Sequence, residues 1–422
     1  MIYALILFAI TYVLMLTFSK YRPYIALGSA LVFILTGMLP LDQIFTAIDW
    51  NVLLMIAGTM GLVQLFIDSH MPARLADMIM TKVPNVQMAA VALALFAGII
   101  SAFVDNVATV LMVAPVALAI CKKLNTNPVP FIIGIAVSSN LQGAATLVGD
   151  TTAIMLGSYA DMSFLDFFWY KGRPGIFFAV ELGAVASALI LAWLFRKEKK
   201  PIDRATQLTP VTDYVPTVLL AGMIVLLISA SFLPSKPDIT NGLICVTLFV
   251  IGMVYTYVRT RKAEAFTGPI KSIDFETIGL LLGLFLVIGG ITHMGVVDAA
   301  AGLLAKMGGG NVFLIYTVIV WASVLFSAFI DNIPYVATML PVVTGLASTL
   351  GIDPTLLYFG LLSGATLGGN MTPIGASANI AGIGILRREG YEVKTSDFCR
   401  IGIPFTLAAV IPAYIYFWVL FA

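Results

Sequence analysis

Long apolar runs, separated by short polar stretches, extend over the whole chain. Most of these runs approach the length of about 20 residues that a helix needs to cross the hydrocarbon core of a bilayer. They lie at 2–18, 23–40, 51–68, 88–104, 107–121, 131–158, 175–195, 214–233, 240–258, 276–292, 312–330, 333–349, 356–384 and 402–421. Seven runs in each half predict an all-α polytopic membrane protein.

One phrase within this apolar pattern occurs twice, 226 residues apart. Residues 101–109 read SAFVDNVAT, and residues 327–335 read SAFIDNIPY. At the same offset, GAATLVG at 143–149 corresponds to GNMTPIG at 369–375. These matches indicate that the two halves of the chain are duplicates of each other.

The duplication divides the chain into three parts. Residues 1–195 form a first repeat, 196–213 a basic cytoplasmic linker, and 214–422 a second repeat. Because each half has an odd number of apolar segments, the second half should insert upside down relative to the first. Two inverted-topology repeats are therefore expected.

Two neighbouring runs in each half leave no room for a loop outside the membrane. Only Asp-Asn separates 88–104 from 107–121, and the spacing between 312–330 and 333–349 is equally short. We interpret each pair as a re-entrant hairpin with Asp-Asn at its tip, which leaves about five true crossings per half. Backbone turning at that depth must line a cavity or be buried in protein. Full crossing by both arms remains an alternative.

Glycine marks a second irregularity in each half. Residues 143–149 and 364–375 are dense in glycine, and Pro373 lies within the second stretch. Glycine costs about 1 kcal/mol relative to alanine inside a helix, and proline costs more. The segments 131–158 and 356–384 are therefore predicted to be helices broken near their middle.

Charge placement sets the expected orientation. The chain is 60% hydrophobic and 11% charged with a net charge of +1, which excludes an ordinary soluble domain and gives no nucleic-acid signal. By the positive-inside rule, the N- and C-termini should be extracytoplasmic in a multi-pass cell (inner or plasma) membrane protein. Nineteen of the 23 Lys and Arg residues then lie in the inside segments 19–22, 69–87, 122–130, 196–213, 259–275 and 385–401.

The hairpin tips and helix breaks should meet at one depth and form a substrate- or ion-binding site. Half-helix ends there present N–H and C=O groups, and the available side chains carry oxygen or amide groups that suit a hard cation or a hydrogen-bonding solute. The candidates are Asp105, Asn106, Thr109, Asn140, Thr146, Asp150, Thr151, Asp331, Asn332, Asn370, Thr372, Ser377 and Asn379. A sodium ion is expected near Asn106, Asp150, Asn332 and Asn379.

The acidic residues among these candidates are the ones for which a function is most strongly expected. Asp105 and Asp331 could act as plain helix N-caps, but Ser or Thr fills that role at lower cost. A charged residue at mid-membrane costs about 2.5–3.5 kcal/mol on insertion scales, so a duplicated one favours a function. Asp150 has no acidic counterpart, since Ala376 occupies its position in the second half. It is therefore a candidate to carry the coupling proton or cation.

Enzymatic motifs are absent from the sequence. There is no HExxH, no GxGD and no GxxxxGK[ST] phosphate-binding loop. ATP-driven pumping would need a separate subunit. We therefore expect a transporter and not an enzyme, with no cofactor and with H⁺ or Na⁺ as the coupling ion. A channel on the same scaffold is a further alternative.

Four motifs resemble a known family along essentially the whole chain. The resemblance is to the ion-transporter superfamily of arsenite permeases, sodium/proton antiporters of the NhaD type and pink-eyed-dilution proteins, and distantly to divalent-anion/sodium symporters. It implies a secondary transporter with an elevator-like or rocking motion, often a homodimer, with an ATPase partner in arsenite systems. The motifs are AFVDNVATVLMVAPV at 102–116, SAFIDNIPYVATMLPV at 327–342, GAATLVGD at 143–150 and GGNMTPIGASANI at 368–380.

The negative charge of the acids at the hairpin tips allows us to rank the substrates that this resemblance suggests. The symporters carry Ser-Asn-Thr where this chain has Asp105-Asn106 and Asp331-Asn332, so their contacts carry over only at the asparagines. Two carboxylates facing a cavity would repel a di- or trivalent anion but attract a cation and tolerate neutral arsenous acid. We expect cation- or proton-coupled efflux of an arsenite-like solute first, sodium/proton antiport second and sodium-coupled anion or dicarboxylate symport third.

Overall fold

The computed structural model describes residues 1–201, 208–233 and 235–422. Part of the predicted linker, 202–207, therefore lies outside the described residues. Helices form almost all of the described secondary structure, which confirms the all-α membrane class. Seven described helices are long and apolar enough to cross a membrane, or up to nine if two bent helix pairs each count as one span.

The elements of the first half follow the predicted runs. Its helices are α1 Ile2–Thr17, α2 Arg22–Leu35, α3 Ile44–Ala47, α4 Trp50–Asp68, α5 Met71–Met80, α6 Val86–Ser101, α7 Asn106–Leu124, α8 Val129–Gly143, α9 Thr151–Tyr159 and α10 Ile176–Leu194. Short 3₁₀ turns are η1 Ser19–Tyr21, η2 Leu41–Gln43 and η3 Leu165–Phe167. Two short antiparallel strands, β1 Trp169–Tyr170 and β2 Arg173–Pro174, pair Trp169 with Pro174.

The second half has a similar order of elements. Its helices are α11 Val215–Ser231, α12 Thr240–Thr260, α13 Glu264–Lys271, α14 Phe275–His293, α15 Val296–Gly308, α16 Val312–Ser327, α17 Asn332–Leu350, α18 Thr355–Gly368, α19 Ser377–Arg388 and α20 Thr395–Phe421. One 3₁₀ turn, η4 Gly369–Met371, follows α18. The predicted interruptions are present in both halves, between α8 and α9 and between α18 and α19.

Three short helices lie in segments that were expected to be loops. They are α5, α13 and α15, and each is amphipathic: α5, for example, buries Pro72, Ala76 and Met80. Their apolar residues recur at helical spacing without forming a long run, so a search for continuous hydrophobic segments misses them. The last helix, α20, also begins at Thr395, before the predicted start at 402.

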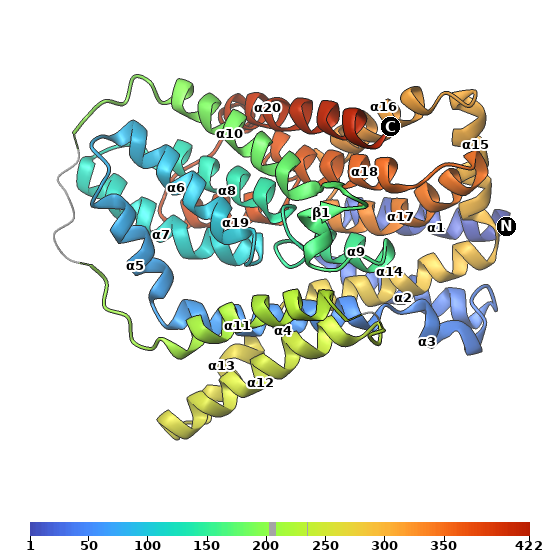
Figure 1. Ribbon diagram of the computed structural model, residues 1–422, viewed down its shortest axis with the longest axis horizontal. Coiled ribbons are helices and arrows are strands. Elements are labelled where there is room, and N and C mark those ends of the chain that lie inside the picture. The colour runs from blue at the N-terminus through green and yellow to red at the C-terminus, as the bar shows by residue number, and fades with distance from the viewer. Residues whose placement is uncertain (202–207, 234) are drawn as a thin grey trace.

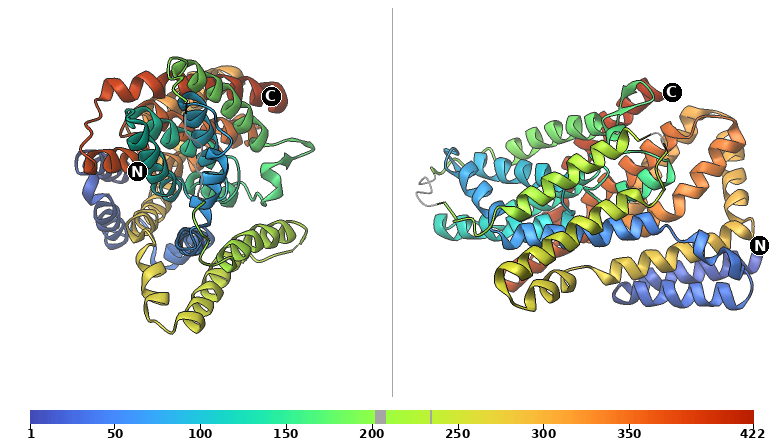
Figure 2. Two further views of the ribbon diagram at one scale, coloured as in Figure 1. Left: turned by 90° about the vertical axis from the view of Figure 1, so that its left-hand side faces the viewer. Right: turned by 60° about the horizontal axis from the view of Figure 1, so that its bottom comes forward.

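The helices form two groups that lie side by side (Figure 1). In one group α4 packs chiefly on α12, and α14 packs on α2. In the other, α6 packs on α8, α16 on α18 and α10 on α20. Figure 2 shows the same division from two further sides, with α12 and α13 of the smaller group, which contains α4 and α14, projecting away from the larger group. The hairpins and broken helices therefore belong to the larger group and meet the smaller one along its surface.

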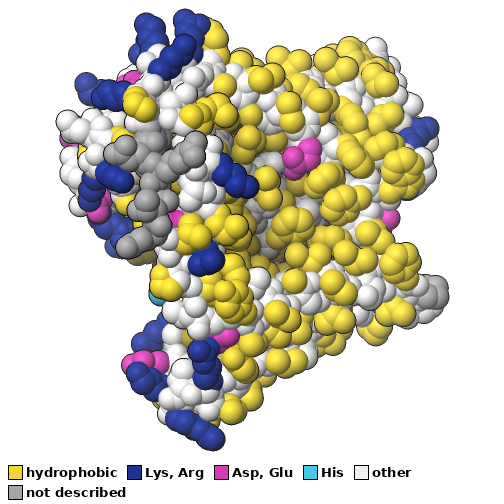
Figure 3. Space-filling view, turned by 60° about the vertical axis from the view of Figure 1, so that its left-hand side comes forward, with side chains coloured by type: hydrophobic (Ala, Val, Ile, Leu, Met, Phe, Trp, Pro, Cys, Tyr) yellow, Lys and Arg dark blue, Asp and Glu magenta, His cyan; other side chains and the backbone are white. Residues whose placement is uncertain are grey.

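The outer surface is suited to a bilayer. Figure 3 shows a broad face of hydrophobic side chains, with most Lys and Arg side chains gathered at one end. Both chain termini lie toward the opposite end, on the right of Figure 1. This distribution agrees with basic inside segments at one end of the molecule, while the orientation of the termini in the membrane stays a prediction.

Candidate functional site

A tight contact joins the first helix break to the first hairpin tip. A Cβ atom on Gly149 would lie 2.5 Å from Gly143 O, 2.7 Å from Ser101 O and 2.8 Å from Ala102 O. No side chain fits there, so glycine allows the chain between α8 and α9 to lie against the end of α6. The Thr146 hydroxyl donates to the same Ala102 carbonyl and fastens the break to the tip.

The second half repeats this contact at the same offset. A Cβ atom on Gly375 would lie 2.6 Å from Gly369 O and 2.7 Å from Ser327 O. The Thr372 hydroxyl donates to Ala328 O, as Thr146 does to Ala102 O. Thr146 and Thr372 therefore use their hydroxyls to position the tips. The inverted orientation of the two halves remains a prediction.

Asparagine amides connect the two broken helices at the centre of the molecule. Asn106 Nδ2 donates to Asn140 Oδ1 at 3.0 Å, and Asn140 Nδ2 donates to Asn370 Oδ1 at 3.0 Å. Asn370 Nδ2 in turn donates to Val137 O at 3.0 Å. All three asparagines are buried. The structure thus brings together predicted residues from the first tip, the first broken helix and the second break.

Asp150 is buried at the junction of the two halves. Its Oδ2 atom accepts a hydrogen bond from Thr152 Oγ1 at 2.7 Å and a longer one from Asn332 Nδ2 at 3.5 Å. Thr152 Oγ1 also lies 2.9 Å from Thr366 Oγ1. Asp150 occupies the N-cap position of α9, yet its carboxylate makes no capping hydrogen bond there. Helix capping alone therefore does not account for this acid.

The two tip acids both cap the helices that follow them. Asp105 Oδ2 accepts from the backbone N–H groups of Val107 and Ala108 at 3.0 and 3.1 Å. Asp331 Oδ1 accepts from Ile333 N at 3.3 Å. The capping interpretation of these acids is thus structurally correct. Their remaining carboxylate contacts differ between the halves, as described below.

A cavity of about 220 Å³ lies between the tips and the smaller helix group. Among its described lining residues there is no Lys, Arg or His. The polar members of the lining are Gln64, Asp105, Asn106, Asp150, Thr151, Ser272, Asp274, Thr277, Asn332 and Ser377. The polar part of the lining therefore consists of oxygen and amide groups, including three carboxylates, and the rest of the lining is apolar. Asp331 is not in the lining.

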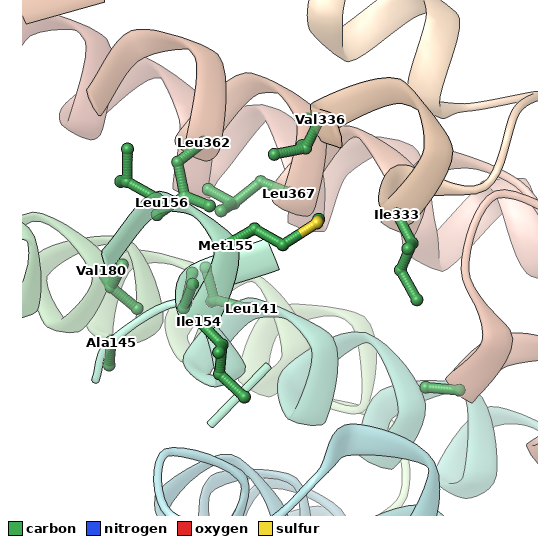
Figure 4. Close-up of a cluster of buried hydrophobic side chains, with 14 of the residues drawn as sticks. Leu141, Ala145, Ile154, Met155, Leu156, Val180, Ile333, Val336, Leu362 and Leu367 are labelled. Carbon is green, nitrogen blue, oxygen red and sulfur yellow. The ribbon is translucent and has the colours of Figure 1, made fainter. Parts of the chain in front are cut away.

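A second, larger cavity of about 1120 Å³ contacts other parts of the same helices. On α9, Thr151 lines the smaller cavity and Met155 lines the larger one. On α17, Ile333 lines the smaller cavity and Ala337 lines the larger one. Four helical residues span only about 6 Å along a helix axis. Figure 4 shows Met155 among other buried apolar side chains in this region. A short apolar layer thus separates the two cavities.

The remaining predicted residues occupy the same region. Thr109 is buried on α7, and its hydroxyl lies 3.5 Å from Val104 O. Ser377 Oγ donates to Asp331 Oδ2 at 3.2 Å. Asn379 Nδ2 donates to Gly369 O and Thr372 O, while its buried Oδ1 has no hydrogen-bond partner among the described residues. No group of three or more His, Cys, Asp or Glu residues in the described chain could hold a metal ion.

Sequence reasoning missed several polar residues at this site: Gln64, Ser272, Asp274 and Thr277 in the cavity lining, and Thr366 and Arg22 beside it. Thr366 contacts both Thr152 and Asn140, and its position 226 residues after Asn140 was a usable signal. Arg22 places Nη1 3.2 Å from Asp331 Oδ2. It was interpreted only as a topology charge in 19–22, although it stands directly before an apolar run.

Several known proteins similar to this chain are described as transporters or as a membrane protein. Uncharacterized transporters of Mycobacterium tuberculosis include one that is 30% identical over 98% of this chain and 97% of its own length. The 46 kDa membrane protein of Mycobacterium leprae is 29% identical over 98% of this chain and 97% of its own length. The human P protein is 29% identical over 74% of this chain and 46% of its own length.

Solved structures share the fold at low sequence identity. The YdaH transporter of Alcanivorax borkumensis superposes with a TM-score of 0.61 at 14% identity, over 89% of this chain and 87% of its own. MtrF of Neisseria gonorrhoeae, from a class of antimetabolite efflux pumps, gives a TM-score of 0.57 at 15% identity, over 96% and 84%. These likenesses concern the fold alone.

A family model described as citrate transporter matches residues 12–361 and 239–422, which together cover most of the chain. The transporter relatives and the transporter fold agree with this match, and they indicate a multi-pass membrane transporter and not an enzyme. The chain therefore belongs to the citrate transporter family, within the ion-transporter superfamily that its motifs resemble.

Proposed function

We propose that this protein is a secondary transporter that couples H⁺ or Na⁺ movement to the efflux of a small neutral, hydroxylated solute such as arsenous acid. The observation that carries this proposal is the smaller cavity, with Asp105 and Asp150 in a lining that has no Lys, Arg or His among the described residues. Carboxylates without a neighbouring cation attract a proton or a metal cation, especially where surrounding protein lowers the effective dielectric constant.

The coupling ion would bind where the halves meet. Asp150 Oδ2 and the amide oxygen of Asn106 or Asn332 are hard ligands of the kind that Na⁺ accepts, and Thr151 adds a hydroxyl to the lining. The buried Oδ1 of Asn379, which has no hydrogen-bond partner in the described part of the chain, supports a further ligand or water in the second half. A proton could instead occupy Asp105 or Asp150. H⁺ and Na⁺ both remain candidates.

The charge of the smaller cavity's lining indicates which kind of solute the protein transports. The family description names citrate, but a free di- or trivalent anion in the smaller cavity would meet three carboxylates and no described cationic side chain. Two unit charges 4 Å apart repel by about 4 kcal/mol at an effective dielectric constant of 20. A neutral hydroxylated solute avoids this repulsion and can hydrogen-bond to Asn and Thr groups. Sodium-coupled anion symport therefore ranks third.

Sodium/proton antiport is the second candidate. It is favoured by the same lining, because carboxylates that bind H⁺ and Na⁺ in turn need no solute site at all. Homodimer formation and an ATPase partner remain predictions for either candidate.

The two cavities support an alternating-access cycle. The smaller one includes Ser272 and Asp274 from a segment predicted to be cytoplasmic, whereas the larger one includes Asp161 and Lys236 from segments predicted to be outside. Moving the apolar layer at Met155 and Ile333 relative to α4 would exchange access between the two sides. The arrangement would correspond to a state open toward the cytoplasm.

Counterflow and gradient-driven flux in proteoliposomes test this proposal. Purified protein would be reconstituted with an imposed pH or sodium gradient, and arsenite, ²²Na⁺ and citrate fluxes would be measured against empty liposomes. We expect gradient-driven arsenite movement; ²²Na⁺/H⁺ exchange without arsenite movement would instead support antiport. Citrate flux with neither of the others would overturn both ranked candidates.

A further inference from the structure

The two tip acids occupy equivalent sequence positions but have different electrostatic surroundings. Asp331 Oδ2 lies 3.2 Å from Arg22 Nη1, and the two side chains are only 9% and 17% exposed. The described residues place no cationic side chain in such a pair with Asp105, whose Oδ2 accepts two backbone N–H groups. One tip thus carries a neutralised pair, and the other carries a lone carboxylate beside the cavity.

This ion pair is unlike the others in the described chain. Lys122–Glu389 and Lys171–Asp353 involve side chains that are 38–58% exposed, and Arg259–Asp213 joins an arginine that is 50% exposed to an aspartate that is 17% exposed. Ion pairs with such exposed partners typically contribute little to stability. Arg22 and Asp331 are far less exposed, so each charge depends on the other. Removing one partner of a buried pair leaves an uncompensated charge, whereas replacing both is often tolerated.

The helices that carry Arg22 hold it against the second hairpin. A sharp bend of 116° between α1 and α2 places Arg22 at the start of α2, where its Nε donates to Met15 O at 3.3 Å. From α1, Tyr12 donates its hydroxyl to Pro334 O at 2.6 Å and contacts Thr338. Two points of attachment therefore connect the α1–α2 pair to the first turn of α17.

We propose that Arg22 is a built-in counter-charge for Asp331, which makes the duplicated tip acids functionally different. Asp331, with Arg22 and Ser377, positions the second hairpin. The coupling ion is left to Asp105 and Asp150, which line the cavity without a basic partner among the described residues. The assignment of the ion to these two acids depends on the proposed transport function, whereas the charge pairing itself does not.

A double-mutant cycle tests the pairing without any transport assay. Arg22→Gln and Asp331→Asn should each lower the melting temperature of the purified protein by several degrees, and the double variant should recover most of that loss. The matched control is Lys171→Gln with Asp353→Asn, an exposed pair for which the two single effects should be small and additive. Additive losses in the Arg22–Asp331 cycle would refute the counter-charge.

If a single variant fails to fold, a conservative variant and the double variant still test the pairing. Arg22→Lys keeps the charge and should be more stable than Arg22→Gln. If Arg22→Gln cannot be purified but the double variant can, the pairing is supported; if Arg22→Lys is as poorly folded as Arg22→Gln, charge is not the reason and the proposal fails.

Flux measurements then separate the roles of the two tip acids. The double variant should keep the sodium or pH dependence of transport, whereas Asp105→Asn should lose it. A stable double variant that has lost this dependence would show that Asp331 handles the ion and would overturn the proposed asymmetry. If the wild type moves none of arsenite, Na⁺ or citrate, the proposed function fails while the melting cycle still decides the pairing.

Discussion

Asn140 on α8 donates a hydrogen bond from its side-chain amide to Asn370 Oδ1 at 3.0 Å, which joins the interrupted helix of one half to that of the other. Asn140 also donates to Thr366 O at 2.8 Å and accepts from Asn106 at 3.0 Å. One fully buried amide therefore connects a hairpin tip with both interrupted segments. It is one of the contacts that hold the two halves together at the site.

Replacing Asn140 with alanine should destabilise the protein. The substitution leaves Asn106 Nδ2, Asn370 Oδ1 and Thr366 O buried without this partner, and each such loss costs about 1–3 kcal/mol. Thermal melting of the purified protein would measure the effect. Ser229→Ala is the control, because within the described chain its exposed hydroxyl bonds only to Val225 O of its own helix. Equal melting temperatures for both variants would contradict the connecting role of Asn140.

Neutralising the cavity acids should abolish ion coupling while leaving the fold intact. Asp105→Asn and Asp150→Asn each remove a charge that would bind the coupling ion, and an interaction of about 1.5–3 kcal/mol corresponds to about a tenfold or greater loss of affinity. Initial rates of gradient-driven flux in proteoliposomes would measure this loss.

The control for the acid variants is Glu264→Gln, at the exposed start of α13. It should transport as the wild type does. Undiminished gradient-driven flux in both Asp105→Asn and Asp150→Asn would exclude these acids as the ion site.

The two break glycines should not tolerate alanine. A Cβ atom at Gly149 or Gly375 would lie 2.5–2.7 Å from at least two backbone oxygens, which cannot move independently of the chain. We expect each variant to lose about 1–3 kcal/mol of stability through overpacking. Thermal melting and flux should both decline.

Gly222 provides the matched control for this prediction. It lies inside α11, and apart from the neighbouring backbone of its own helix, no atom of the described residues would lie within 4 Å of a Cβ atom there. Gly222→Ala should be neutral or stabilise the helix by up to about 1 kcal/mol, because alanine has the higher helix propensity. Tolerance of alanine at Gly149 as well would mean that the break does not pack tightly on the tip.

Cysteine labelling should report the predicted orientation. Ser272 lines the smaller cavity and Ser235 the larger one, and both are exposed. In a Cys399→Ser background, where the remaining Cys121 and Cys245 are buried, an impermeant maleimide should label Ser235→Cys in intact cells. Ser272→Cys should react only in inside-out vesicles. The reverse pattern would place the termini on the cytoplasmic side.

Much of the fold could be predicted because its signals are local. Apolar runs locate the long helices, and glycine with Pro373 locates both interruptions. The amphipathic helix α5 was missed, because Arg74 and Asp77 interrupt its apolar residues, so that Ala76 and Met80 belong to no long continuous run. Its apolar face can be recognised only at helical spacing.

The site could be predicted in part. Asp105, Asp150 and Asn332 do line one cavity, and Asn140 and Asn370 do meet. Two repeated acids suggested two equal carboxylates at that cavity, whereas Asp331 lies instead against Arg22. A repeated motif predicts that its two copies have equivalent backbone positions. It does not predict which residues from outside the motif contact each copy.

The sequence by itself determined that the chain enters a membrane, that it contains two related halves, and that acids and glycines stand where its helices are interrupted. These properties follow from the order of residue types along short stretches. Only the tertiary structure decided that Arg22 neutralises Asp331, that Asn332 reaches Asp150, and which acids remain beside the cavity. These partners are far apart in the sequence, so helix packing sets their distances.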